Sequence, residues 1–291
     1  MILRSTLFAP ANHRRHAEKA VANAADAAIL DLEDAVSIAE KPAAREAARE
    51  LLARSRPPGT VVFVRINGLE GPFAYDDLRA VVGPGLDGIV VPKIESGSQL
   101  AIVDWLLRQL ERERGLRASS IDLLPIVETA RGLTAVDEIA AASARVRRLN
   151  FGAGDFTLDT GMTWTPGNPA LLWAKVRVIV ASRSAGLERP LDTVYPDLRD
   201  AAGFEREAVE AKQLGFQGKA CIHPSQVEIV HRIFTPSAEE VARAREVTSA
   251  FERAVAGGSA SIQLDGQFID YPIAERARRV IQIAEGLRSG G

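Results

Sequence analysis

The sequence has almost none of the residues and motifs that mark secreted, membrane or metal-thiolate proteins. Its 291 residues include one cysteine, Cys221, which can form neither an internal disulfide nor a Cys-x-x-Cys zinc site. No run of 18 apolar residues occurs, and the apolar run around Arg4 at the N-terminus is too short for a signal peptide. We therefore expect a cytoplasmic protein that does not associate with membranes.

Excess positive charge and glycine-rich phosphate loops are also missing. The chain has 36 Lys and Arg against 38 Asp and Glu, a net charge of -2, which leaves no broad basic surface for nucleic acid. Neither GxGxxG nor GxxxxGK[ST] is present, which argues against a dinucleotide or P-loop site. These absences favour a small-molecule substrate.

Eight strand-like runs alternate with helical segments along the chain. Eight such units in about 225 residues match a (β/α)₈ TIM barrel better than a doubly wound sheet. The predicted strands are 3–8, 27–32, 61–66, 88–91, 121–127, 148–153, 191–195 and 218–222. The predicted helices between them are 12–25, 41–53, 99–112, 135–144, 170–185 and 201–214.

Further helical stretches follow the eighth strand, at 225–234, 238–256 and 273–287, interrupted by the Gly-rich segment GGSASIQLDGQF. We assign 1–235 to the barrel and 236–291 to a C-terminal helical extension.

Charged residues gather where the predicted strands end. Active sites of such barrels lie at the carboxyl ends of the strands, so these residues should share one rim. They are Asp31, Glu33 and Asp34 after strand two, Arg65 after strand three, Lys93 after strand four, Glu128 after strand five and Asp155 after strand six.

Glu128 and Asp155 follow adjacent strands and can together hold Mg²⁺, which needs only one or two protein carboxylates. In the alternative, Glu128 caps a helix near Thr129 and Asp155 closes the GAGD turn. Asp31 and Glu33 share a strand face and can order waters around the metal. Asp34 is expected to point the other way, and its alternative role is a helix cap.

Arg65 ends the apolar run VVFV and must meet an anion, since an unpaired buried guanidinium is costly. The anion is either a substrate carboxylate, bound bidentately, or a structural partner such as Asp31 or Glu33. Lys93 can form a Schiff base or a rim salt bridge.

Two further groups carry weaker signals. Arg4, Arg14 and Lys19 form a basic cluster in the first strand and helix that can hold phosphates if it flanks the mouth. Cys221 and His223 share a strand face and can form a thiolate pair, although a buried cysteine is the more common arrangement.

Eight groups of short motifs, spread along the sequence, make the chain resemble the citrate lyase beta-subunit-like aldolases, the HpcH/HpaI or CoA-ester lyase family. The matching stretches are RSTLFAP, ILDLEDAV with KPAAR, VRING, GIVVPKIES, LLPIVETARGL, LNFGAGDFTLDTGM, GKACIHPSQV and GQFIDYP. They run from Arg4 to Pro272 and so cover nearly the whole chain.

The resemblance implies a lyase of the malyl-CoA, citramalyl-CoA or citryl type that releases an acetyl-type thioester and a 2-oxo acid. It implies Mg²⁺ on Glu128 and Asp155, the oxo-acid carboxylate on Arg65, and coenzyme A or an acyl carrier protein as the thioester carrier. It also implies a homotrimer or hexamer in which Asp270, as acid/base group, enters a neighbouring subunit's site. The residue-level alternative for Asp270 is a helix N-cap before Pro272.

Three other functions remain open from the sequence. They are a class I aldolase that uses Lys93, a thioesterase or synthase of the same family, and a non-catalytic subunit of a complex.

Overall fold

The structure, a computed structural model, describes residues 2–57, 59–165 and 169–289. The chain forms two compact units, Leu3–His231 and a smaller unit that consists of the segment from Arg232 onward together with Ile2. The division falls inside helix α10 (Pro224–Phe234), a few residues before the boundary at 235 that the sequence suggested.

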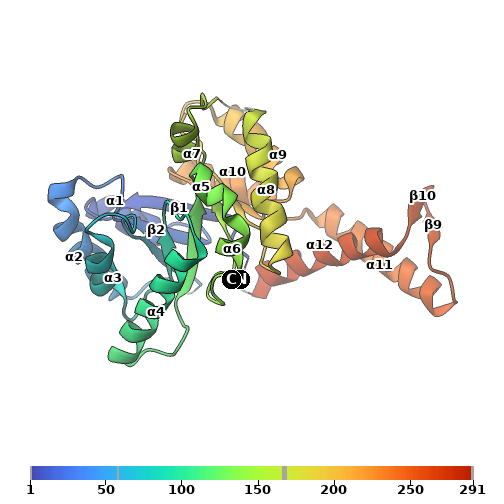
Figure 1. Cartoon of the computed structure of the whole chain (residues 1–291). Coiled ribbons are helices and arrows are strands. Elements are labelled where there is room, and N and C mark those ends of the chain that lie inside the picture. The colour runs from blue at the N-terminus through green and yellow to red at the C-terminus, as the bar shows by residue number, and fades with distance from the viewer. Residues whose placement is uncertain (1, 58, 166–168, 290–291) are drawn as a thin grey trace. The chain divides into compact units, whose positions relative to one another are not determined.

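Eight parallel strands close into a barrel in chain order, which confirms the predicted TIM barrel (Figure 1). Gly218 lets β8 close on β1, because a Cβ there would overlap the carbonyl oxygens of Leu3 and Arg4. The strands are β1 (Ser5–Pro10), β2 (Ala27–Asp31), β3 (Val61–Arg65), β4 (Gly88–Val91), β5 (Asp122–Val127), β6 (Asn150–Phe151), β7 (Leu191–Asp192) and β8 (Gly218–Cys221).

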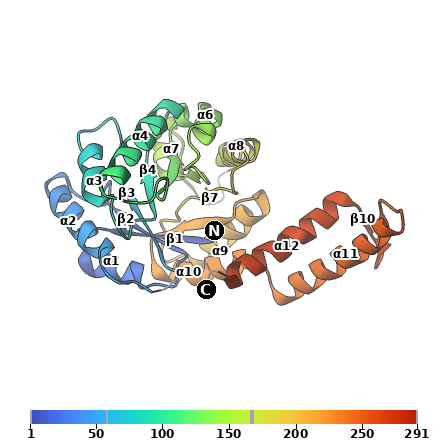
Figure 2. The ribbon, with the colours of Figure 1, turned by 90° about the horizontal axis from the view of Figure 1, so that it is seen from below.

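Helices surround these strands (Figure 2). Side-chain oxygens of Ser96, Thr129 and Asp200 cap α4, α5 and α9, as expected for helix N-termini. The helices before α10 are α1 (Arg14–Val21), α2 (Lys41–Leu52), α3 (Ala74–Val81), α4 (Gly97–Glu113), α5 (Ala130–Thr134), α6 (Val136–Ala141), α7 (Ala153–Thr160), α8 (Ala170–Ser184) and α9 (Ala201–Leu214), with a 3₁₀ turn η1 (Ile38–Glu40). The helix ranges predicted from the sequence do not include α3, α5 or α7.

The barrel interior is packed with apolar side chains at alternate strand positions. They form one cluster of Leu3, Ala27, Ile29, Val61, Phe63, Val90, Leu124, Ile126 and Leu191. Since side chains of a strand alternate between faces, the next inward positions on three strands are Asp31, Arg65 and Glu128. The apolar layer thus gives way to charged side chains at the carboxyl ends of the strands.

A polar network ties together the opposite, N-terminal end of the barrel. The Arg4 guanidinium donates to both carboxylate oxygens of Asp26, at 3.0 and 2.6 Å. His231 Nε2 lies 2.7 Å from Ser5 Oγ and 3.4 Å from Asp26 Oδ1. These contacts join the starts of β1 and β2 to α10.

The second unit is a helical hairpin with a small core of its own. Helix α11 (Ala238–Ala256) begins with a capping box between Ser237 and Glu240 and packs along α12 (Tyr271–Ser289) (Figure 2). Between the helices, the predicted Gly-rich segment contains an antiparallel pair, β9 (Ile262–Leu264) and β10 (Gln267–Ile269). No helix in the described part of the chain is long and apolar enough to cross a bilayer.

Candidate active site at the barrel mouth

A cavity of about 360 Å³ opens at the carboxyl ends of the strands. Four of the predicted site residues line it, namely Asp31, Arg65, Glu128 and Asp155. The remaining walls include apolar side chains such as Phe8, Ile126 and Trp164. A few charged side chains in a cavity with largely apolar walls are typical of a small-molecule binding site.

Arg65 is held from one side by two carboxylates. Its Nε and one terminal nitrogen donate to the two oxygens of Asp31 at 2.7 and 2.6 Å, and the other terminal nitrogen lies 2.9 Å from Glu33 Oε2. The guanidinium carbon also lies 5.1 Å from the centre of the Phe8 ring. The structural partners weighed for Arg65 are therefore present, and they fix its guanidinium at the cavity wall.

Glu128 is a buried carboxylate that forms no ion pair within 4 Å among the residues that the structure describes. It is 3% exposed and accepts a 2.8 Å hydrogen bond from the backbone N–H of Lys93. Burial, and then repulsion from Asp155 and Glu33, raises the pKa of Glu128 to about 8. Thr129, not Glu128, caps the following helix, so the capping alternative for Glu128 is wrong.

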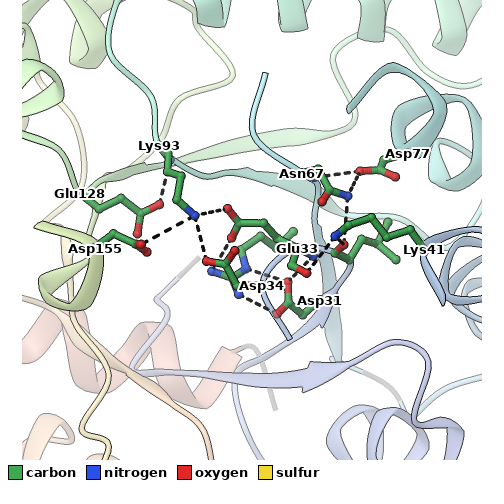
Figure 3. Close-up of polar contacts among 11 residues, drawn as sticks. Asp31, Glu33, Asp34, Lys41, Asn67, Asp77, Lys93, Glu128 and Asp155 are labelled. Carbon is green, nitrogen blue, oxygen red and sulfur yellow. Dashed lines mark hydrogen bonds and ion pairs between the residues drawn. The ribbon is translucent and has the colours of Figure 1, made fainter. Parts of the chain in front are cut away.

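Asp155 lies beside Glu128, and Figure 3 shows the two carboxylates side by side. The sequence placed Asp155 in a turn after strand six, but β6 ends at Phe151 and Asp155 belongs to the first turn of α7. The helix therefore carries Asp155 toward the cavity.

The pair has the donor chemistry that Mg²⁺ requires. Two carboxylates that repel each other, one of them fully buried, are stabilised by a divalent cation, and Mg²⁺ takes its remaining ligands from water or substrate oxygens. Among the described residues there is no group of three or more His, Cys, Asp or Glu placed to hold a metal. The site thus fits a cation that takes only some of its ligands from protein carboxylates.

Lys93 is surrounded by acidic side chains. Its Nζ lies 2.5 Å from Glu33 Oε1, 2.9 Å from Asp34 Oδ2 and 3.8 Å from Asp155 Oδ1 (Figure 3). Although burial opposes the charge, these carboxylates raise the pKa of Lys93 above its ordinary value. An ammonium held in its charged form is a poor nucleophile, so the structure speaks against a Schiff base at Lys93.

Asp34 does not point away from the site as predicted. β2 ends at Asp31, so the two-residue alternation no longer applies, and Glu33 and Asp34 both reach Lys93. Nor does Asp34 cap a helix, because the next helical turn starts at Ile38.

The basic cluster predicted at the mouth is divided in the structure. Arg4 precedes β1 and pairs with Asp26 at the opposite end of the barrel, so its assignment to the mouth is wrong. Arg14 begins α1 and contacts Glu18 and Glu50, whereas exposed Lys19 lies in the last turn of that helix.

The thiolate alternative at the eighth strand is also excluded. Cys221 is fully buried, and burial raises the pKa of its thiol to about 12. His223 lies beyond the end of β8, is exposed and contacts Ser225. Cys221 is a core residue.

Asp270 belongs to the second unit and lies directly before α12. Its Oδ1 accepts a 3.1 Å hydrogen bond from the Ile273 backbone N–H, so the N-cap alternative is correct. This bond uses one carboxylate oxygen and leaves the charge in place.

The cavity residues that sequence reasoning missed include Gly152, Trp164 and Asn150. Gly152 lies behind Glu128, where a Cβ would overlap Glu128 Oε2, and the glycines of the GAG stretch were the available signal. Trp164 lines the cavity beside Gly154 and has no local sequence signature. Asn150 lines the cavity from β6, and a polar residue inside an apolar strand could have identified it.

Comparison with known proteins places the chain in a family. Residues 4–224 match the HpcH/HpaI aldolase/citrate lyase family, and residues 180–270 match a C-C bond lyase of the TIM-barrel fold. The chain therefore belongs to the HpcH/HpaI aldolase/citrate lyase family, which confirms the resemblance drawn from the sequence.

Individual relatives cover nearly the whole chain. Citrate lyase subunit beta from Leuconostoc mesenteroides subsp. cremoris is 36% identical over 97% of this chain and 93% of its own length. L-malyl-CoA/beta-methylmalyl-CoA lyase from Rhodobacter capsulatus is 34% identical over 97% and 94%. The crystal structure of CitE from Mycobacterium tuberculosis with magnesium, acetoacetate and coenzyme A is 32% identical, covers 98% of both chains and has a TM-score of 0.79.

Proposed function

We propose that this chain is a magnesium-dependent carbon-carbon lyase. Its substrate is a 3-hydroxyacyl thioester of the malyl-CoA, citramalyl-CoA or citryl type, which it cleaves to an acetyl-type thioester and a 2-oxo acid, or forms from them. The observation that carries the proposal is the buried Glu128 carboxylate beside Asp155, in a cavity that Arg65 also lines. The two lyase relatives and the ligands of the CitE crystal structure support the same chemistry.

Glu128 and Asp155 are the residues that would hold Mg²⁺. Bound there, the ion supplies Lewis-acid chemistry that draws charge from the substrate oxygens near the bond to be cleaved. The other rim carboxylates, Asp31 and Glu33, are committed to Arg65 and orient it, while Glu33 also accepts from Lys93.

Arg65 binds the carboxylate of the substrate. Its bonds to Asp31 and Glu33 fix the plane of the guanidinium, so little side-chain entropy is lost when a second anion arrives. Orientation of the carboxylate then places the carbon-carbon bond in the cavity, away from bulk water.

Asp270 acts as the acid/base group in a neighbouring subunit. Cleavage transfers the hydroxyl proton to water and leaves the bonding electron pair on the acetyl fragment as a thioester enolate, which must gain a proton at carbon. The Asp270 carboxyl delivers that proton, and it abstracts the same proton in the synthetic direction. A homotrimer or hexamer would bring Asp270 of one chain to the mouth of the next.

The thioester carrier is coenzyme A, with an acyl carrier protein as the other possible donor of the same group. Arg14 and Lys19 are the proposed contacts for the carrier's phosphates. We further propose a cytoplasmic location, which the single buried cysteine favours.

Malyl-, citramalyl- and citryl-CoA, each assayed with and without Mg²⁺ on the isolated chain, test this function. We expect one or more thioesters to yield acetyl-CoA only when Mg²⁺ is present. Release of free coenzyme A instead would identify a thioesterase or synthase. Inactivity of the isolated chain on all three, with activity restored inside a complex, would identify a subunit.

A further inference from the structure

Asn150 is a neutral polar side chain of the cavity wall, and its strand register places it one inward position before the level of Glu128. Asn150 opens β6, two residues or about 7 Å along the strand from Gly152, which borders Glu128. In the sheet register Asn150 pairs with Ile126 on one side and Leu191 on the other, and both belong to the interior cluster. Residues paired across parallel strands face the same side, so the Asn150 side chain enters the barrel.

Asn150 is buried and uses little of its hydrogen-bonding capacity. The residue is 5% exposed, and its Oδ1 has no hydrogen-bond partner among the residues that the structure describes. Its Nδ2 reaches the carbonyl oxygen of Phe151 at 3.5 Å, the outer limit of a hydrogen bond. A buried acceptor without a donor costs about 1–3 kcal/mol, so a ligand that supplies a donor would be favoured.

Two threonines of the barrel each have only one of the two properties of Asn150, which are a place on the cavity wall and a buried polar atom without a partner. Thr193 also lines the cavity, but its hydroxyl accepts a 2.9 Å hydrogen bond from the Ala153 backbone N–H. Thr6 Oγ1 is buried without a partner, but Thr6 does not line the cavity. In the described part of the chain, Asn150 alone combines an unpaired buried polar atom with a place on the cavity wall.

We propose that Asn150 Oδ1 accepts a hydrogen bond from the substrate's hydroxyl group, the one whose carbon carries the bond to be cleaved. The inference rests on the proposed function. With the carboxylate on Arg65, the hydroxyl is the group that faces the Glu128 and Asp155 pair. Asn150 is paired with Ile126 and so lies one inward position from Glu128. The hydroxyl is also the donor that such a substrate brings to the site.

This contact distinguishes a hydroxy acid from the oxo acid that cleavage releases. The hydroxyl donates a hydrogen bond to Oδ1, whereas a ketone oxygen has no hydrogen to donate. A site built around a substrate hydroxyl disfavours the analogue that lacks it.

Calorimetric binding of lactate, as both enantiomers, and of pyruvate to the Mg²⁺-loaded full chain tests the contact. In Asn150→Ala we expect the affinity for the preferred lactate to fall about tenfold and that for pyruvate to stay within about twofold. Asn150→Leu keeps the volume and should give the same ratio. Thr6→Val removes an equally buried, unpaired hydroxyl outside the cavity and should change neither affinity.

Equal losses of lactate and pyruvate binding in folded Asn150 variants would overturn the inference, because they indicate a structural role. Unchanged lactate binding, or a wild-type chain that binds neither ligand, would also overturn it. The lyase assay tests the proposed function separately. A wild-type chain that cleaves none of the thioesters refutes that function, whereas a selective loss of lactate affinity still supports the Asn150 contact.

Discussion

Gly152 lies directly behind the Glu128 carboxylate, so close that a Cβ on Gly152 would overlap both Oε2 and Cβ of Glu128. Glycine at this position therefore gives the glutamate the room to reach the cavity. We expect Gly152→Ala to displace Glu128 and weaken Mg²⁺ binding at least about tenfold. Titration with Mn²⁺ followed by electron paramagnetic resonance measures the effect.

Gly68→Ala is the matched control for this change, since a Cβ at Gly68 meets nothing within 4 Å. The Gly68 variant should bind the ion like the wild type. Normal ion binding by a folded Gly152→Ala protein would contradict the steric role of Gly152.

The raised pKa of Glu128 predicts that metal binding depends on pH. In the metal-free folded chain the carboxyl has a pKa of about 8, above its model-peptide value of 4.5, so ionising it between those values opposes folding. The stability that this group contributes is present below pH 4.5 and is lost as pH rises from 4.5 toward about 8. A bound cation replaces the proton, so Mg²⁺ affinity should rise about tenfold per pH unit from 6 to 8 and then level off.

Calorimetry in buffers of different ionisation enthalpy counts the proton released with Mg²⁺. We expect close to one proton at pH 7 for the wild type and for Glu138→Gln, which alters an exposed carboxylate. Glu128→Gln should lose both the release and most of the affinity. Metal binding that is independent of pH would speak against Glu128 as a ligand.

A composite site predicts that two inactive variants restore activity together. Asp270→Asn keeps a side chain that can cap α12 but removes the charge, and should lower kcat at least about 100-fold. Co-expression with Glu128→Gln should restore about a quarter of the activity, because random symmetric assembly pairs an intact barrel with an intact Asp270 in that share of sites.

Co-expression of Asp270→Asn with Asp270→Ala provides the control and should restore nothing. If the first mixture also stays inactive while assemblies containing both chains are isolated, Asp270 does not act in a neighbouring subunit.

The network at the N-terminal end of the barrel predicts acid-sensitive stability. Burial alone would raise the pKa of Asp26, but hydrogen bonds from His231 and Arg4 lower it to about 2, from 3.8. The resulting stabilisation is present above 3.8 and is lost as pH falls from there toward 2. Asp26→Asn should cost about 2 kcal/mol at pH 7 and less at pH 3.

Urea unfolding of both proteins at pH 7, 4 and 3 measures this difference. Asp137→Asn, at an exposed carboxylate paired with Arg177, should cost far less at every pH. A penalty at Asp26 that does not shrink with acid would contradict the prediction.

Periodicity predicted most of the barrel because the strands alternate regularly. Gly88–Val91 and Ala201–Leu214 have the predicted bounds, whereas β6 and β7 are only two residues long. Strand six was predicted to reach Ala153, yet α7 begins there, since an apolar run does not show where a strand gives way to a helix.

Prediction of the site succeeded where a residue ends a strand or directly follows one, and it failed for the direction of Asp34, farther along a loop. Arg65 and Glu128 end apolar runs, so alternation places them inward. Asp34 lies after β2, where the chain turns, and no count of residues gives its direction. Lys93 has φ of 50°, a left-handed backbone that is unusual for a lysine and that local sequence does not specify.

Arg4, Asp26 and His231 lie at one end of the barrel strands, and the cavity lies at the other. A protein arranged in this way can change its substrate through substitutions in the loops that follow the strands while the opposite end continues to anchor the fold. The residues that set substrate specificity then differ from those that stabilise the fold. Selection can change specificity without unfolding the protein.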